Sequence, residues 1–69
     1  QVGEAIRLLE AFVDTNPPYA PAYLMLSRLY IADGRIQQAA ELLSNAANDP
    51  GLGQQERDTF RSMVSSLAR

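Results

Sequence analysis

An internal period of 34 residues constrains the possible folds of this 69-residue chain more than any other feature of its sequence. When the sequence is shifted against itself by this distance, apolar residues fall on apolar residues at the positions expected to be buried, whereas Ala11 falls on Asn45. The matched pairs are Ala5 and Ala39, Leu8 and Leu42, Leu9 and Leu43, Phe12 and Ala46, Leu26 and Phe60, and Tyr30 and Val64. Helices of similar length joined by short loops would give part of this agreement. A fixed period of roughly 20 to 50 residues is nevertheless the sequence signature of repeat architectures, so it favours a stack of similar units within one small domain.

Four stretches of the chain have apolar residues every three or four positions, which predicts four α-helices. The expected ranges are 2–14, 21–33, 36–48 and 54–68. Pro17 and Pro18 should end the first helix, whereas Pro21 suits the first turn of the second. Gly34 is expected to end the second helix in the left-handed conformation. Because no stretch alternates with a period of two, no strand is predicted and the fold class is all-α.

The second helix is apolar on more than one face and is therefore expected to be central. The third helix should bury one stripe, which consists of Ile36, Ala39, Ala40, Leu42, Leu43, Ala46 and Ala47. The fourth helix has a single narrow apolar stripe, which consists of Phe60, Met63, Val64 and Leu67. Residues 48–51 read as a turn, and Leu52 and Gly53 are assigned to the loop that follows.

The repeated residues also form a family pattern. They read Tyr23-x-x-Leu26-Ser27-x-x-Tyr30, then Gly34, then Ala39-x-x-x-Leu43-x-x-Ala46, and then Pro50. This pattern resembles the tetratricopeptide repeat, in which W-x-x-L-G-x-x-Y is followed by A-x-x-x-F and P. The earlier run Ala5-x-x-x-Leu9-x-x-Phe12, with Pro17, resembles the second half of a preceding repeat.

The resemblance implies stacked antiparallel helix pairs in one domain. Residues 18–50 would form a full repeat, residues 1–17 the second half of a repeat, and residues 51–69 a C-terminal capping helix. Ser27 and Ala39 would be small because two helices approach closely there. Arg61 stands where the period expects a small residue, so the fourth helix should not accept a further helix on that face.

In tetratricopeptide proteins, the first helix of each pair lines a concave groove that holds a peptide or a partner helix. The groove positions implied here are Pro21, Leu24, Arg28, Ile31 and Ala32, together with Gln55, Asp58, Ser62 and Ser65. Leu24 and Ile31 beside Arg28 would suit an apolar or weakly acidic segment. The two apolar residues could equally pack on the preceding helix or be singly exposed. The Lys and Asn clamp for chaperone carboxylates is not expected, since Leu24 and Arg28 occupy its positions.

Composition narrows the classes of function. The chain has no cysteine or histidine, which removes thiolate nucleophiles, imidazole bases and Cys/His metal sites. Six basic and eight acidic residues give a net charge of −2, and the scattered arginines do not favour nucleic-acid binding. The acidic residues, scattered along the chain, are read as a solvated surface. No apolar run is long enough to span a membrane. We therefore expect neither enzymatic activity nor a cofactor.

Two functions remain in competition. The first is a protein–protein interaction module that presents a helical groove to a partner peptide or helix, within a larger protein. The second is self-association, either through the first helix, which lacks the neighbour it would have in a repeat array, or through the strip of Leu24 and Ile31. Fewer than three repeats are marginally stable alone, which favours a longer parent protein, an oligomer or a bound partner.

Overall fold

The computed structural model of the chain describes residues 2–15 and 18–67. It contains four helices: α1 Val2–Thr15, α2 Ala20–Ala32, α3 Ile36–Ala47 and α4 Gln54–Leu67. Each helix ends within one residue of its expected bounds, and the described residues include no strand, so the all-α fold is confirmed. The expected role of Pro17 at the end of the first helix concerns a residue outside the described ranges.

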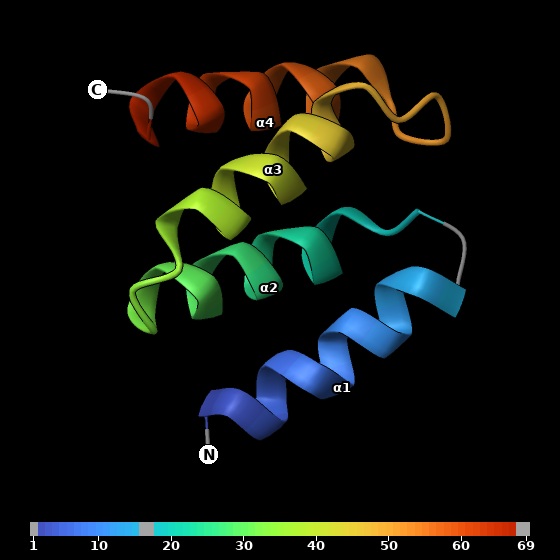
Figure 1. The fold of residues 1–69 in the computed structure, drawn as a ribbon. Coiled ribbons are helices and arrows are strands. Elements are labelled where there is room, and N and C mark those ends of the chain that lie inside the picture. The colour runs from blue at the N-terminus through green and yellow to red at the C-terminus, as the bar shows by residue number, and fades with distance from the viewer. Residues whose placement is uncertain (1, 16–17, 68–69) are drawn as a thin grey trace.

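The helices lie side by side in chain order, and each packs against the next (Figure 1). Consecutive helices run in opposite directions. The molecule is a slab with extents of 33 × 31 × 14 Å. Since a helix with its side chains is about 10–12 Å across, neighbouring helices cover only part of each helix in such a thin slab.

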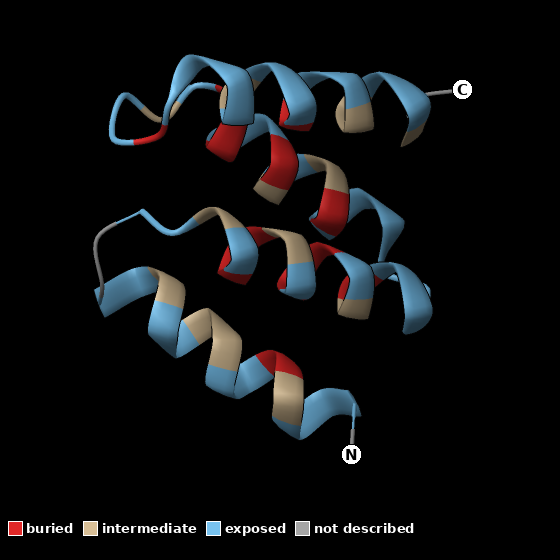
Figure 2. Ribbon diagram, turned by 180° about the vertical axis from the view of Figure 1, so that it is seen from behind, coloured by how far each residue is buried: buried red, intermediate tan, exposed pale blue. Residues whose placement is uncertain are grey.

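Two apolar clusters hold the stack together. The first joins Tyr23 of α2 to Leu43, Ala46 and Ala47 of α3, Leu52 of the following loop and Phe60 of α4. The second joins Ile6 of α1 to Leu26 and Tyr30 of α2 and Ala39 of α3. Buried residues are therefore concentrated on α2 and α3 (Figure 2). The expectation that the second helix is central is confirmed, and α3 shares that position.

The small residues at the α2–α3 contact are fully buried, as the repeat pattern predicts. Ser27 and Ala39 both have no exposed surface. The Ser27 hydroxyl donates a hydrogen bond of 2.8 Å to the carbonyl oxygen of Leu24, so the buried hydroxyl is satisfied within its own helix. These positions therefore let two backbones approach without leaving a polar group unpaired.

Gly34 ends α2 as predicted. Its φ of 80° lies in the left-handed region, which glycine adopts without steric cost. The Gly34 amide donates to Ile31 over 3.0 Å and the Arg35 amide donates to Tyr30 over 2.7 Å. These are the two hydrogen bonds of a Schellman motif, which reverses the chain into α3.

Two expectations about the core were incomplete or wrong. Leu52, which the sequence assigns only to a loop, is 6% exposed and belongs to the cluster around Tyr23. Ile36, expected in the buried stripe of α3, is 41% exposed. Ile36 is the first residue of α3, directly after the reversal at Gly34, and at this end of the helix the side chain is left partly open to solvent.

Candidate binding groove between α2 and α4

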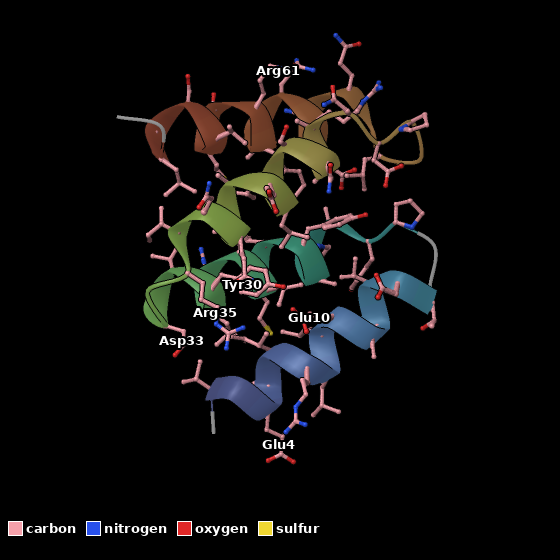
Figure 3. All side chains as sticks on the ribbon, in the orientation of Figure 1. Glu4, Glu10, Tyr30, Asp33, Arg35 and Arg61 are labelled. Atoms are coloured by element: carbon pink, nitrogen blue, oxygen red, sulfur yellow. The ribbon has the colours of Figure 1, made fainter. Side chains whose placement is uncertain are left out.

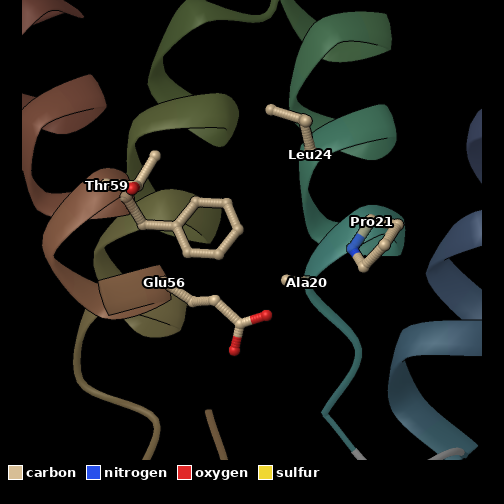
Figure 4. A pocket seen from close by; sticks show the side chains of 6 residues that line it. Ala20, Pro21, Leu24, Glu56 and Thr59 are labelled. Atoms are coloured by element: carbon tan, nitrogen blue, oxygen red, sulfur yellow. The ribbon is translucent and has the colours of Figure 1, made fainter. Parts of the chain in front are cut away.

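An open apolar hollow of about 260 Å³ lies between α2 and α4 (Figure 4). Its lining residues are Ala20, Pro21, Leu24, Glu56, Thr59 and Phe60. Pro21 is held in the first turn of α2, where its missing amide hydrogen costs no helical hydrogen bond. Phe60 is 3% exposed, and its ring packs edge-on against Tyr23 with 6.1 Å between the ring centroids. The core side chains therefore fix one wall of the hollow in place.

Among the described residues that line this hollow, Glu56 alone is charged. Its Oε1 accepts a hydrogen bond of 3.0 Å from the amide of Gly53, the residue before α4. This is half of a capping box, in which an acidic residue of the first turn satisfies the backbone amide that begins the helix. The carboxylate extends from α4 toward Ala20 and Pro21 (Figure 4). The hollow thus combines apolar walls with one negative charge at its edge.

A second hollow, of about 450 Å³, lies on another face of α4 and is polar. It is lined by Asp58, Arg61, Ser62, Ser65 and Ser66. Arg61 pairs with Asp58 over 3.0 Å, and its Nη2 donates a 3.3 Å hydrogen bond to the carbonyl oxygen of Ala47. Arg61 therefore caps the C-terminal end of α3, where carbonyl groups lack helical partners.

Comparison with families of known proteins decides the identity of the fold. A family model described as tetratricopeptide repeat matches residues 1–50. The chain belongs to the tetratricopeptide repeat family. Searches of curated proteins and of solved structures gave no match. Tetratricopeptide repeats generally mediate protein–protein interactions. The matched residues contain α1, α2 and α3, whereas α4, with half of the hollow, lies beyond the match.

The tetratricopeptide groove positions inferred from the sequence do not all meet in one place. Pro21 and Leu24 line the apolar hollow between α2 and α4. Arg28, Ile31 and Ala32 lie farther along α2, are exposed, and do not line it.

The expected positions on α4 lie elsewhere. Asp58, Ser62 and Ser65 line the polar hollow, and Gln55 is exposed. In their place, Glu56, Thr59 and Phe60 form the α4 wall of the apolar hollow. The sequence predicts Phe60 for the apolar stripe of the fourth helix, whereas Glu56 is among the acidic residues that the sequence assigns to a solvated surface.

The buried tyrosines of the repeat make hydrogen bonds to carboxylates. The Tyr23 hydroxyl donates to Asp49 Oδ2 over 3.1 Å, and the Tyr30 hydroxyl donates to the Glu10 carboxylate (Figure 3). Burial, followed by the hydrogen bond to Glu10 and its charge, raises the pKa of Tyr30 to about 12. Burial and the interaction with Asp49 likewise raise the pKa of Tyr23. Both phenols therefore keep their protons to a higher pH than an ordinary tyrosine does, and they tie separate elements together.

The described residues include no group of three or more acidic, cysteine or histidine side chains placed to hold a metal ion. Across the described ranges, no helix has both the length and the apolar character needed to cross a membrane.

Proposed function

We propose that this tetratricopeptide repeat chain is an interaction module that binds a segment of a partner protein in the hollow between α2 and α4. The observation that supports this proposal is an open apolar surface whose walls are packed onto the core. Leu24 contacts the cluster around Tyr23, and Phe60 belongs to it. Such a preformed surface loses little conformational entropy when it binds.

The chemistry of the hollow indicates an apolar side chain next to a positive charge. Burying one leucine-sized side chain contributes about 1.5–3 kcal/mol. An exposed ion pair with Glu56 would add only about 0.2–1 kcal/mol. The apolar contact would therefore supply most of the affinity, and Glu56 would decide between a cationic and an anionic neighbour. This preference is the reverse of the weakly acidic partner suggested by Arg28 in the sequence, because Arg28 does not line the hollow.

A selection from a random peptide library tests the proposal. We expect the selected peptides to share an apolar residue beside Lys or Arg. Thr59→Arg should abolish their binding, because it places a cation in the hollow beside Glu56. Ser65→Arg introduces the same side chain at the polar hollow and should leave binding unchanged. Peptides that bind the Thr59→Arg variant as well as the parent chain, or a library that yields no binders, would contradict the proposal.

Glu56→Gln separates the charge of Glu56 from its role as a helix cap, because glutamine also forms the capping-box hydrogen bond. We expect this variant to retain its fold and its apolar preference but to bind Lys- and Glu-containing versions of a selected peptide equally well. A retained preference for the Lys version would mean that another residue sets it.

A further inference from the structure

A second apolar surface lies on α1, away from the proposed groove. Four residues at helical spacing, Ala5, Leu8, Leu9 and Phe12, form what we call the α1 stripe. Leu8 is largely exposed, and Phe12 is partly exposed, with its ring packed against Tyr19 at 6.2 Å between centroids. Beside the stripe is an apolar hollow of about 280 Å³ between α1 and α2, lined by Leu9, Phe12, Tyr19, Pro21, Ala22 and Met25.

The internal repeat indicates what kind of element covers such a stripe. The positions on α3 that match the α1 stripe are Ala39, Leu42, Leu43 and Ala46. Three of these, Ala39, Leu43 and Ala46, are fully buried. The covering elements are α2 and α4, which lie on either side of α3 and run antiparallel to it (Figure 1). Within the chain, therefore, the equivalent surface is closed by antiparallel helices.

The α2–α3 contact sets aromatic side chains against alanines. Tyr23 shares a cluster with Leu43 and Ala46 near one end of the contact, and Tyr30 shares a cluster with Ala39 near the other. The α1 stripe contains both kinds of residue, an aromatic side chain and an alanine, in a single helix. Its aromatic residue, Phe12, lies seven positions after its alanine, Ala5, with two leucines between them.

We propose that two copies of this chain associate through antiparallel α1 helices, with the two-fold axis between Leu8 and Leu9. In this register, Phe12 of each copy lies over Ala5 of the other, and Leu8 faces Leu9 of the other copy. The contact repeats the large-on-small packing of α2 on α3, and the stripe contains no charged residue that would have to be desolvated. This proposal is independent of the groove between α2 and α4, because it uses a different surface.

The available area fits a reversible dimer. Leu8, Phe12, Tyr19 and Met25 are 68%, 40%, 55% and 57% exposed. At about 200 Å² for each large side chain, complete covering of these residues in two copies would bury at most roughly 900 Å². Ala5 and Leu9 bring the total to about 1,000 Å², which is the lower limit for a specific interface.

The polar face of α4 supports a closed dimer rather than a longer assembly. Head-to-tail stacking would place α4 of one copy on the α1 stripe of the next. The face of α4 that bears Asp58, Ser62 and Ser65 is polar. It offers no apolar partner for the stripe. A two-fold contact instead pairs the α1 stripe of one copy with the α1 stripe of the other, so neither copy keeps an open stripe.

Sedimentation of the 69-residue chain at concentrations from about 1 μM to about 1 mM tests the dimer. Dimers with interfaces of this size dissociate and re-form at such protein concentrations. We expect the mass to rise to that of a dimer. Leu8→Glu should raise the dimer dissociation constant at least about tenfold, because a charge replaces an apolar contact in both copies. Ile36→Glu changes an exposed isoleucine outside the stripe and should leave the dissociation constant unchanged.

Two further variants test the register. Ala5→Phe sets two phenylalanines against each other and should dissociate the dimer, whereas Ala5→Phe combined with Phe12→Ala exchanges the large and small residues and should restore it. Helical circular dichroism equal to that of the parent confirms that each variant folds. A chain that stays monomeric throughout, a dimer insensitive to Leu8→Glu, or a double variant without restored association would overturn the proposal. So would a monomer whose stripe instead binds a peptide of residues 19–34, because the stripe would then belong to a helix of another protein.

Discussion

Tyr23 and Tyr30 connect the outer parts of the molecule to its central helices. Tyr30 links α2 to Glu10 on α1, and Tyr23 links α2 to Asp49 in the loop after α3. Asp49 also accepts a 2.9 Å hydrogen bond from the amide of Gly51, so one carboxylate holds both the turn and the tyrosine. The tyrosines thus provide directional contacts as well as apolar area.

The pKa of Tyr30 leads to a prediction about alkaline pH. Its value of about 12 in the folded chain lies above the ordinary value of 10.0, because burial and Glu10 disfavour the phenolate. The folded state therefore holds this proton more tightly than the unfolded state. The stability that results is fully present below pH 10 and is lost as the pH rises through 12. We expect the Tyr30→Phe variant to lose stability less steeply between pH 10 and 12.

Urea unfolding at a series of pH values measures this slope. Tyr19→Phe, at an exposed tyrosine whose side-chain hydroxyl makes no hydrogen bond to the described residues, is the control and should leave the slope unchanged. Some decline should remain in Tyr30→Phe, because burial also raises the pKa of Tyr23. Equal slopes for the parent and Tyr30→Phe would contradict the assignment of a neutral, buried phenol at this position.

Single residues were predicted well only where their role depends on nearby residues in the chain. Gly34 as a left-handed helix end follows from its position after an apolar run. The placement of both tyrosines in the core follows from their helical spacing. Their carboxylate partners were read as part of a solvated surface, because Glu10 and Asp49 lie 20 and 26 residues away in the sequence. Such pairs depend on how the helices stack, which local patterns do not specify.

At the scale of elements, the loop between α3 and α4 contributes more to the core than a connection of its length suggests. Leu52 packs with Tyr23 and Phe60 in the first cluster. The same loop meets the segment before α2, since a Cβ built on Gly51 would lie 2.6 Å from Cγ of Pro18. This close approach requires glycine at position 51. The loop is therefore a packed element of the fold.

Truncation of Leu52 tests this role of the loop. Leu52→Ala should reduce the free energy of unfolding by about 2–4 kcal/mol, as expected for a buried leucine. Ile36→Ala, within a helix but 41% exposed, should cost less than about 1 kcal/mol. Chemical denaturation of the two variants gives both values. A larger loss for Ile36→Ala than for Leu52→Ala would contradict the structure of this loop.

The α4 wall of the proposed groove shows what periodicity leaves open. The spacing of Phe60, Met63, Val64 and Leu67 correctly identifies the side of α4 that faces the core. It does not determine which neighbouring flank of the helix faces α2. The family resemblance pointed to Asp58, Ser62 and Ser65, whereas Glu56 and Thr59 are the flanking residues beside the apolar hollow. The rotation of α4 depends on its packing against α3 and Leu52, which cannot be read from the helix alone.

At the scale of the whole molecule, the two proposed surfaces follow from one arrangement of helices. In a slab 14 Å thin, α2 and α3 are covered on both sides, whereas α1 and α4 each have one packed neighbour in the described part of the chain. The α2–α4 hollow forms because α3 holds these two helices beside each other. The α1 stripe remains partly open because α2 covers the side of α1 that bears Ile6, with Leu9 at the edge of that contact.

The close α2–α3 contact is the feature on which this arrangement depends, and thermal unfolding of Ala39→Trp tests it most directly. Ala39 has no exposed surface, so tryptophan would overpack the contact. We predict a fall in Tm of about 10 °C or more, or loss of the folded state, given about 4–8 °C per kcal/mol for a domain of this size. Asn45→Trp, at an exposed position of the same helix, should leave the Tm nearly unchanged. An Ala39→Trp chain that unfolds at the same temperature as the parent would contradict the stacking of α2 on α3, and with it both proposed surfaces.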